Sequence, residues 1–563
     1  MFRYFKNYKK ELILAPLFKL MESFFDLLIP LVMASIIDEG IVSGNISFII
    51  QRSLLIVGIG LVGFSCTVIA QYYAAKGSVG ITCDLREDLF VQIQKLSFKE
   101  LDGFSASSLI SRLTNDTNTF QNGLNLAIRL LLRSPFIVFG ALVMSFIISQ
   151  NLSLIFLVTI IVLTVIVVTI ALVTFPMYGK VQGRLDEVLS IIKDDLSGVR
   201  ILRAFRKERS EIDHFENRNE ELYTEQKKVT DIANILNPLT YGLVNIAIVL
   251  IIYYGSFEIN NGLLLNGKLI ALYNYLSQIL IELIKLVNLI IVITKAMASF
   301  GRIDEVINTE SSLLIEKNPE KETDSVIVFD HVNFRYPEGS ADALEDLNFE
   351  IRRNERIGII GPTGCGKSSI VQLLNRFYDV SSGNIYINGK NIRDYELDKL
   401  RDNISTIFQR QNLLSGTVRS NLLSAKVDAS EGEMFEAIRD AQADDFINDL
   451  DREVRQGGTN FSGGQNQRLT IAQALLKKSD ILIVDDATSA LDYKTEREVK
   501  EKLIKPDMTT LIISQRINNI KECDRIMVMD DGKIVDFDTH EKLMDNCQTY
   551  IDMYNSQVKK EEN

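Results

Sequence analysis

Apolar residues are concentrated in the first 300 positions of the 563-residue chain, in runs interrupted by only a few charges. A membrane-spanning helix needs about 20 predominantly apolar residues. Runs of this length lie near Leu12 to Ile37, Leu54 to Ala75, Leu130 to Ile148, Leu152 to Phe175, Ile232 to Tyr254 and Leu269 to Ile293. The pattern therefore predicts an all-α membrane domain over residues 1–300 with six spanning helices.

Basic residues are gathered in two of the connections between these runs. The second-to-third connection holds Lys76, Arg86, Lys95, Lys99, Arg112 and Arg129, and the fourth-to-fifth holds Lys180, Arg184, Arg200, Arg203, Arg206, Lys207 and Arg209. Positive connections mark the cytoplasmic side, so both termini are predicted to be cytoplasmic and the protein to lie in the cell membrane. Both connections are long and periodic, which predicts helix extensions that turn through short crosswise helices near Asp102 to Arg112 and Ala204 to Phe215.

A few charged residues fall inside the predicted spans: Glu22, Asp26, Glu282 and Lys285. Each costs about 3 kcal/mol at the centre of a bilayer, so these side chains are expected to face protein or a water-filled cavity. Two interpretations stay open. The charges contact a transported substrate, or they are structural, with Glu282 and Lys285 paired at i, i+3 or lying at the interface.

A different pattern follows a polar linker at residues 301–324. From residue 325 to the end, short apolar strands alternate with amphipathic helices, which predicts an α/β domain with a largely parallel sheet and a short polar tail. The net charge of -12 and the pI of about 5.1 argue against a nucleic-acid-binding protein. Five scattered cysteines without metal-ligand spacing indicate reduced thiols.

The segment GPTGCGKS at Gly361 to Ser368 fits the pattern G-x-x-x-x-G-K-[ST] and follows the apolar run Ile357 to Ile360. This order predicts a strand, a phosphate-binding loop and a helix. Its glycines let backbone N–H groups converge on phosphate oxygens. Lys367 is expected to reach the β/γ-phosphates and Ser368 a magnesium ion. The predicted nucleotide-binding loop comprises Gly361, Pro362, Thr363, Gly364, Cys365, Gly366, Lys367, Ser368 and Ser369.

Further motifs follow in a specific order along the α/β domain. An aromatic residue, Tyr336, precedes the phosphate loop, and Gln409 closes the apolar strand Ile404 to Phe408. A glycine pair before a helix makes a second N-terminal phosphate site. Its residues are Phe461, Ser462, Gly463, Gly464 and Gln465. The strand Ile481 to Val484 then delivers Asp485 and Asp486, carboxylates suited to magnesium, and Ser489 to Asp492 follow.

With these motifs, essentially the whole chain resembles a half-size ABC transporter of the exporter type. The resemblance implies that Tyr336 stacks on adenine, Gly361 to Ser368 are Walker A, and Gln409 is the Q-loop glutamine that joins Ser368 and Asp485 around the metal. It makes Phe461 to Gln465 the signature, Asp485 the Walker B aspartate, Ser489 to Asp492 the D-loop and the crosswise turns coupling helices. In this family two nucleotide domains sandwich two ATP molecules, so a second subunit is implied.

Three positions depart from the family pattern. Asp486 stands where the family has the glutamate that polarises the attacking water, and its carboxylate is one methylene short. A displacement of about 1 Å in a catalytic group can cost around 100-fold in rate. Ser514-Gln515-Arg516 stands where the switch histidine belongs, and Gln515 cannot become cationic. Gln456 replaces a glutamate before the signature.

These departures predict one half of a heterodimeric exporter. Its own Walker A would bind ATP in a degenerate, slow site, while its signature completes the partner's catalytic site. The alternatives are a homodimeric exporter with two slow sites and an ATP-gated channel or regulatory subunit. The apolar spans suit a drug, a lipid or a hydrophobic peptide equally well as substrate, with membrane lipid as the surrounding partner.

Overall fold

The structure is a computed structural model that describes residues 2–316, 323–337, 339, 341–410, 412–486, 491, 493–503 and 507–561. The chain divides into two compact units. The helical unit comprises Met1–Gln94 and Ala106–Asn308, and the α/β unit comprises Lys95–Ser105 and Thr309–Asn563.

The helical unit has, among its described residues, six stretches that are long and apolar enough to cross a membrane, as predicted. They run over Lys9–Ile41, Ile46–Lys95, Ala106–Ile148, Gln150–Ala204, Glu208–Asn260 and Asn266–Asn308. The helices of this unit are α1 (Phe2–Phe5), α2 (Lys9–Ser35), η1 (Ile36–Ile41), α3 (Ile46–Lys95), α5 (Ala106–Ser111), η2 (Arg112–Asp116), α6 (Thr117–Leu130), α7 (Arg133–Ile148), α8 (Gln150–Ala204), α9 (Glu208–Asn234), α10 (Leu236–Asn260) and α11 (Asn266–Asn308).

Several of these helices are longer than a bilayer requires. At 1.5 Å per residue, the 50 residues of α3 span about 75 Å, compared with a hydrocarbon core of about 30 Å. Between α8 and α9 the chain turns through Phe205 to Lys207, and the residues up to Phe215 belong to α9 rather than to a separate crosswise helix. The helix α11 continues to Asn308, into the segment expected to be a linker.

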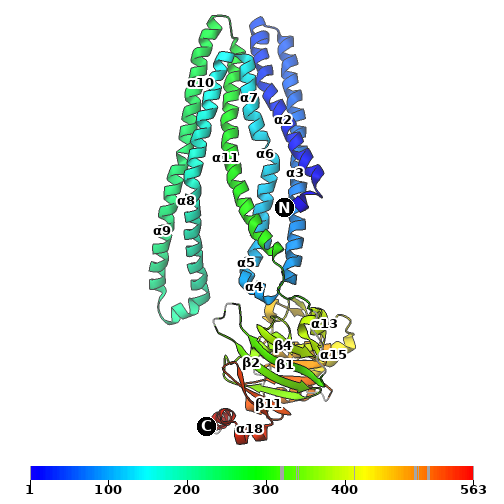
Figure 1. The fold of residues 1–563 in the computed structure, drawn as a ribbon. Helices are drawn as coiled ribbons and strands as arrows, with labels where there is room; N and C mark the ends of the chain where they lie inside the picture. Colours follow the sequence, from blue (N-terminus) through cyan, green and yellow to red (C-terminus); the bar gives the residue numbers. More distant parts are fainter. Residues whose placement is uncertain are drawn as a thin grey trace. The chain divides into compact units, whose positions relative to one another are not determined.

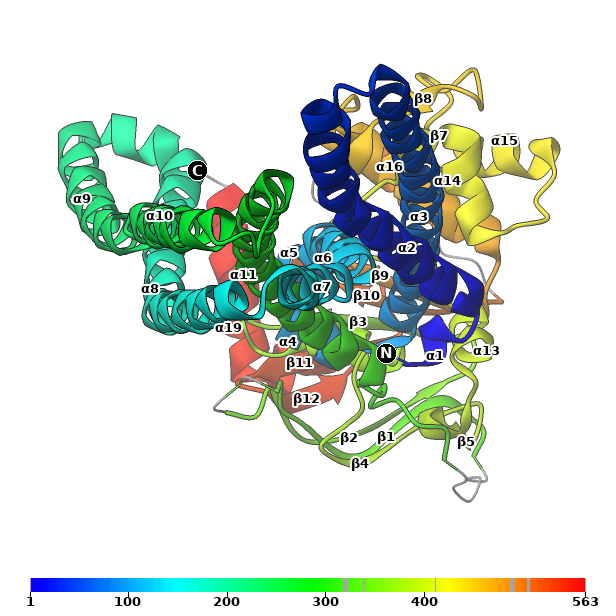
Figure 2. The same cartoon turned by 90° about the horizontal axis from the view of Figure 1, so that it is seen from above.

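The core of the helical unit is arranged around α11. This helix packs against α2, α6, α7 and α10 (Figure 1). Helix α8 packs against α9 and α10, and these three helices stand together on one side of α11 in both views (Figure 2). Tyr275 of α11 is fully buried, and its hydroxyl donates to the Leu27 carbonyl of α2 at 2.5 Å. Small and aliphatic residues on the facing helices fill the space around it.

The α/β unit contains a six-stranded sheet in the order β12-β11-β3-β10-β9-β6, parallel except for β12. An antiparallel sheet, β2-β1-β4-β5, and a small pair, β7-β8, complete it. The strands are β1 (Ser325–Phe334), β2 (Leu344–Arg352), β3 (Arg356–Ile360), β4 (Ser382–Ile387), β5 (Lys390–Asn391), β6 (Ile404–Ile407), β7 (Gly416–Thr417), β8 (Glu453–Val454), β9 (Ile481–Asp485), β10 (Thr509–Ile513), β11 (Arg525–Asp530) and β12 (Lys533–Asp538). The predicted fold class, a helical membrane domain followed by an α/β domain, is confirmed.

Three hydrophobic cores hold the described part of the α/β unit together. One fills the space between the sheets around α12, one lies among α14, α15 and α16, and one lies between the six-stranded sheet and the helices α18 and α19. The helices of this unit are α4 (Phe98–Phe104), α12 (Lys367–Leu374), η3 (Ile392–Asp394), α13 (Leu397–Asp402), α14 (Val418–Ala425), α15 (Glu431–Asp440), η4 (Gln456–Gly458), α16 (Gly463–Lys477), α17 (Tyr493–Leu503), η5 (Ile517–Asn519), α18 (His540–Asn546) and α19 (Gln548–Glu561).

The parallel register decides where the candidate site forms. Ile513 at the end of β10 is paired with Ile359 of β3 on one side and with Asp485 of β9 on the other, and Ile407 of β6 is paired with Val484. The carboxyl ends of four neighbouring strands therefore lie along one sheet edge, where open α/β sheets bind ligands.

Candidate nucleotide site

The phosphate loop leaves β3 at Gly361 and enters α12 at Lys367, as the sequence predicts. Gly364 and Gly366 have φ of +90° and +95°, a left-handed conformation that favours glycine. A Cβ on Gly361 would lie 2.3 Å from the Met529 carbonyl oxygen of β11, closer than atoms can pack. The loop geometry therefore depends on glycine for its backbone conformation and for its approach to the sheet.

Lys367 is folded over this loop. Its ammonium donates to the carbonyl oxygens of Gly361 at 2.8 Å and Pro362 at 2.7 Å, and it lies 3.5 Å from the Cys365 sulfur. The side chain is buried although it carries a charge. A buried ammonium at the N-terminus of a helix creates the positive environment that phosphate oxygens require.

Asp485 is the last residue of β9, and the Ser368 hydroxyl at the start of α12 donates a hydrogen bond to it. Burial raises the pKa of Asp485 and the neighbouring charge of Asp486 adds to the rise, whereas Ser368 and Lys367 oppose it. A hydroxyl and a carboxylate side by side are the oxygen donors that Mg²⁺ accepts in phosphate sites. The donor set therefore fits a magnesium ion.

Asp486 follows at once, with a left-handed backbone at φ +47°. Its N–H donates to the Ile513 carbonyl at 2.9 Å, which fixes it against the end of β10. Burial raises the pKa of its carboxyl group, and the cations Arg516 and Lys367 lower it. Because the hydrogen bond to Ile513 fixes the backbone of Asp486, the loop cannot simply shift to make up for a side chain that is one methylene short.

The predicted switch position, Gln515, lies in the loop after β10. Its backbone carbonyl oxygen accepts from the Gln557 side-chain N–H of α19 at 2.8 Å, and the Gln557 side-chain oxygen accepts from the Ile517 N–H at 2.9 Å. The Ser514 hydroxyl oxygen accepts from the Arg516 N–H at 3.0 Å. The backbone of this loop is thus fixed by neutral hydrogen bonds, two of them from a single residue of α19.

Tyr336 and Gln409 border the same sheet edge. The Tyr336 hydroxyl lies 3.0 Å from the Ser369 hydroxyl of α12, and its ring packs edge-on against Phe334 with centroids 4.7 Å apart. Gln409 comes two residues after the end of β6, next to Phe408. Phe408 stacks on the Phe377 ring at 6.0 Å.

The signature segment begins α16, in the core formed with α14 and α15. The Ser462 side chain accepts from the Gln465 N–H at 3.3 Å, and the Gln465 side chain accepts from the Ser462 N–H at 3.0 Å, which forms a capping box. Ser462 and Gly463 are exposed, with Gly464 and Gln465 half-buried beside them. Phe461, in contrast, is buried against Phe446, so its ring supports the segment from inside.

The sheet edge therefore brings together Walker A, Asp485, Asp486 and the Gln515 loop, with Tyr336 and Gln409 beside them. Gln456 lies in the short turn η4 before the signature, next to Gly457, whose N–H donates to the Leu413 carbonyl at 3.1 Å. Of the expected D-loop, Ser489 to Asp492, only Leu491 lies within the described residues.

The charged residues in the predicted spans form one cluster in the helical unit. Glu282 pairs with Lys285 at 2.9 Å, as one of the two interpretations predicts. The cluster also contains Arg133, which the sequence reasoning missed. Its guanidinium lies 2.8 Å from Glu282, 3.2 Å from Asp26 and 3.7 Å from Glu22, and Lys19 pairs with Glu22 at 2.5 Å. The signal for it in the sequence was the position of Arg133 at the start of an apolar run.

Comparisons with known proteins agree with this arrangement. Residues 12–283 match the family model described as ABC transporter transmembrane region, and residues 344–489 match the one described as ABC transporter. The chain is 34% identical to the uncharacterized ABC transporter ATP-binding protein YfiB of Bacillus subtilis, over 97% of this chain and 96% of the relative. It is 30% identical to an ATP-dependent lipid A-core flippase of Syntrophus aciditrophicus, over 93% and 88% of the two chains.

The fold resembles the structure of a bacterial Atm1-family ABC exporter with ATP bound, with a TM-score of 0.82 over 98% of both chains at 23% identity. The six spanning helices, the phosphate loop at the sheet edge and the two family matches lead to one conclusion. The chain belongs to the ABC transporter family as a half-size exporter, a multi-pass membrane protein whose ATP-binding domain is an ATPase coupled to transport.

Proposed function

We propose that this chain is one half of a heterodimeric exporter in which its own Walker A forms a slowly hydrolysing site. The protein would lie in the cytoplasmic membrane, with both termini and the nucleotide domain on the cytoplasmic side. The observation that carries the proposal is the contrast within one site. Every group that binds phosphate is present, whereas Asp486 and Gln515 occupy the two positions where the family has its glutamate and histidine.

The binding groups support ATP with Mg²⁺ as the ligand. Lys367 and the N–H groups of the phosphate loop would hold the phosphates, Tyr336 would stack on adenine, and Ser368, Asp485 and Gln409 would surround the magnesium ion. The groups that remain for hydrolysis are Asp486, whose side chain is short, and Gln515, which is neutral. Gln515 can donate a neutral hydrogen bond to the γ-phosphate but cannot supply positive charge to the transition state.

The signature supports the second half of the proposal. Ser462 is exposed at the N-terminus of α16, where its hydroxyl and the N–H groups of Gly463 and Gly464 would face an anion. In the dimer this segment would face ATP held by the partner's Walker A. The chain would therefore contribute little hydrolysis of its own and still be required for hydrolysis by the partner.

For the substrate we propose an amphiphile, such as a lipid, a hydrophobic drug or a hydrophobic peptide. The relatives include proteins named ATP-dependent lipid A-core flippase, at 30% and 29% identity. The charge cluster does not favour an ionic substrate, because three cations and three carboxylates already neutralise one another there. We assign it to holding α2, α7 and α11 together.

The test of the charge cluster is a pair of variants. Arg133→Leu leaves Glu22, Asp26 and Glu282 without their shared cation, which typically costs about 3–5 kcal/mol for a buried pair. The detergent-solubilised complex should then melt at a clearly lower temperature. The matched control Arg184→Leu, on an exposed ion pair of α8, should have little effect. Normal melting of Arg133→Leu would contradict the structural assignment.

The test of the heterodimer is purification of the tagged chain from its native membrane. We expect a second, different ABC half in a 1:1 complex. The chain purified without that partner should bind ATP but turn it over slowly. A homodimer with rapid turnover would contradict the proposal, and ATP-dependent conductance without movement of ethidium or a fluorescent phospholipid would indicate a channel instead.

A further inference from the structure

Three consecutive residues just after α12, Arg376, Phe377 and Tyr378, make contacts in three directions. We call them the junction. They lie in the α/β unit, together with the segment Lys95–Ser105, which contains α4. The helix α12 begins at Lys367 of Walker A and ends at Leu374, so one short helix separates the phosphate loop from the junction.

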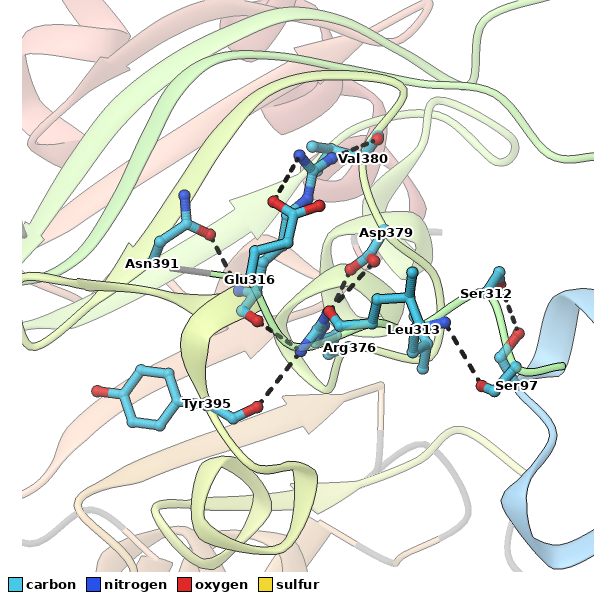
Figure 3. A network of polar contacts seen from close by, with 12 residues as sticks. Ser97, Ser312, Leu313, Glu316, Arg376, Asp379, Val380, Asn391 and Tyr395 are labelled. Carbon is cyan, nitrogen blue, oxygen red and sulfur yellow. Dashed lines mark hydrogen bonds and ion pairs between the residues drawn. The ribbon is translucent and has the colours of Figure 1, made fainter. Parts of the chain in front are cut away.

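Arg376 fixes the chain that enters the α/β unit. It is fully buried, and its guanidinium donates to the Leu314 carbonyl at 2.6 Å and to Asp379 at 2.9 Å, with a further bond to the Arg393 carbonyl at 3.2 Å (Figure 3). Its backbone is left-handed at φ +47°. A buried arginine with this many partners defines a rigid position for the residues that follow it.

Phe377 contacts the segment Lys95–Ser105. Its ring lies 4.5 Å from the ring of Phe98, the first residue of α4. The Ser97 hydroxyl, just before this helix, lies 3.1 Å from the Ser312 hydroxyl in the entering chain (Figure 3). Ser97 and Glu100 form a capping box that holds the first turn of α4. The segment is thus attached at its beginning by packing and by a neutral hydrogen bond.

Tyr378 makes the charged attachment at the end of the segment. Its hydroxyl donates to the Asp102 carboxylate of α4, and its side chain is 7% exposed. Burial, followed by the bond to Asp102, raises the pKa of Tyr378, so the hydroxyl stays protonated and remains a donor at any physiological pH. Hydrogen bonds to charged groups are about twice as strong as neutral ones.

The same tyrosine touches the nucleotide side. Its ring packs edge-on against Tyr336 with centroids 5.4 Å apart, and the Tyr336 hydroxyl reaches Ser369 of α12. Tyr336 is the residue assigned above to adenine stacking. One side chain, Tyr378, therefore touches both the adenine-side ring and the helix α4.

We propose that Tyr378 is a positioning residue that couples Tyr336, and with it the adenine end of the nucleotide, to the segment Lys95–Ser105 through its hydrogen bond to Asp102. This inference rests on the proposed role of Tyr336. When adenine fixes the Tyr336 ring, the Tyr378 ring loses freedom to tilt, because the two rings are in edge-to-face contact. The hydroxyl is then held in line with Asp102, and α4 is held to the nucleotide domain.

The variants separate the hydroxyl from the ring. Tyr378→Phe removes one oxygen and keeps the packing against Phe334 and Tyr336. Asp102→Ala removes the acceptor, whereas Asp102→Asn keeps an oxygen that can accept the same bond. Tyr550→Phe is the matched control, because Tyr550 is also a buried tyrosine of this unit whose hydroxyl makes a hydrogen bond, to His540 at 2.8 Å, away from the junction.

The measurement is amide hydrogen exchange over Lys95–Ser105 in the native complex in lipid nanodiscs, with and without Mg·ATP. In the wild type, Mg·ATP should slow exchange in this segment. In Tyr378→Phe and Asp102→Ala the segment should exchange about tenfold faster, the scale of one hydrogen bond to a charged group, and the response to Mg·ATP should disappear. Tyr550→Phe should behave like the wild type, and Asp102→Asn should fall between the wild type and Asp102→Ala, because a neutral amide oxygen accepts a weaker bond. The double variant Tyr378→Phe/Asp102→Ala should equal either single one.

Two outcomes would overturn different claims. Exchange in Tyr378→Phe that matches Tyr550→Phe, with its response to Mg·ATP intact, overturns the coupling role of Tyr378. The binding of a fluorescent ATP analogue to Tyr336→Ala tests the adenine assignment by itself, because this variant leaves the Tyr378 hydroxyl and Asp102 in place. Unchanged analogue affinity there would overturn the assignment on which the inference rests.

Discussion

The two halves of the nucleotide site differ in how closely they keep the family pattern. On the phosphate-binding side, glycines sit where left-handed backbone or close approach requires them, and Lys367 is buried over the loop. On the hydrolytic side, Asp486 and Gln515 lie on the loops after β9 and β10, and both depart from the family. The difference suggests that retention of ATP, rather than its turnover, is the task of this site.

The largest expected effect separates the two sites of the complex. Ser462→Arg places bulk and charge at the signature, where loss of one well-placed oxyanion donor alone typically costs about 100-fold or more. We expect ATPase activity and transport of the native complex to fall by at least that factor. Lys367→Ala should reduce them less, because in the proposed heterodimer it disables the site that turns over slowly.

The control for this pair is Ser430→Arg. Ser430 is an exposed N-cap with the same type of capping box, at the start of α15, so its loss costs about the same 1 kcal/mol of helix stability. It should leave activity nearly unchanged. If Lys367→Ala lowered ATPase activity and transport as much as Ser462→Arg, this chain's own site would contribute as much hydrolysis as its partner's site, which contradicts the proposal.

A smaller effect is expected from the phosphate loop itself. Gly364→Ala and Gly366→Ala both force a left-handed alanine, which costs about 1–2 kcal/mol. Only the Cβ at Gly366 meets a backbone atom, the Ala343 carbonyl oxygen at 2.6 Å, while the one at Gly364 meets nothing within 4 Å. Gly366→Ala should therefore weaken ATP binding about tenfold more than Gly364→Ala. Equal losses would mean that the close packing at Gly366 is not required.

A gain of function tests the hydrolytic side. Asp486→Glu with Gln515→His restores the carboxylate length and a group that can become cationic, so ATPase activity of the complex should rise severalfold. Asp486→Asn should lower it only slightly, since the residue contributes little. No rise in the double variant would show that a further part of this site limits hydrolysis.

The smallest effect concerns pH. Burial raises the pKa of Asp485, so this group begins to bind protons at a higher pH than an ordinary carboxyl group. Protons and Mg²⁺ compete for the ionised form, so as the pH is lowered, Mg²⁺ affinity should begin to fall at a higher pH than an ordinary carboxyl group would cause. Titration of Mg²⁺ into the ATP-loaded complex measures this. An affinity that is flat down to the ordinary carboxyl range would contradict the role of Asp485.

Local signals in the sequence were sufficient for the fold and for much of the site. The spans follow from apolar length alone, and the phosphate loop from glycine spacing after a buried strand. The strand Ile481 to Val484 is observed as β9, extended by Asp485. These features depend on neighbours in the chain, which a sequence displays directly.

Partners far apart in the chain could not be predicted. Tyr378 and Asp102 are separated by 276 residues, and nothing in either segment points to the other. Arg376 looks like a surface arginine, because arginine is rarely fully buried. Glu22, Asp26 and Glu282 were recognised as costly charges, whereas their shared partner Arg133 was missed because it too is far from them in the chain.

The most direct test of the account is the analysis of nucleotide trapped in the native complex after a single round of turnover with Mg·ATP. In the proposed heterodimer the complex carries two ATP sites, and the site containing Lys367 would bind ATP but hydrolyse it slowly. We predict that about one unhydrolysed ATP per complex remains, and that Lys367→Ala abolishes this retained ATP. Equal conversion of ATP to ADP at both sites would contradict the asymmetric site.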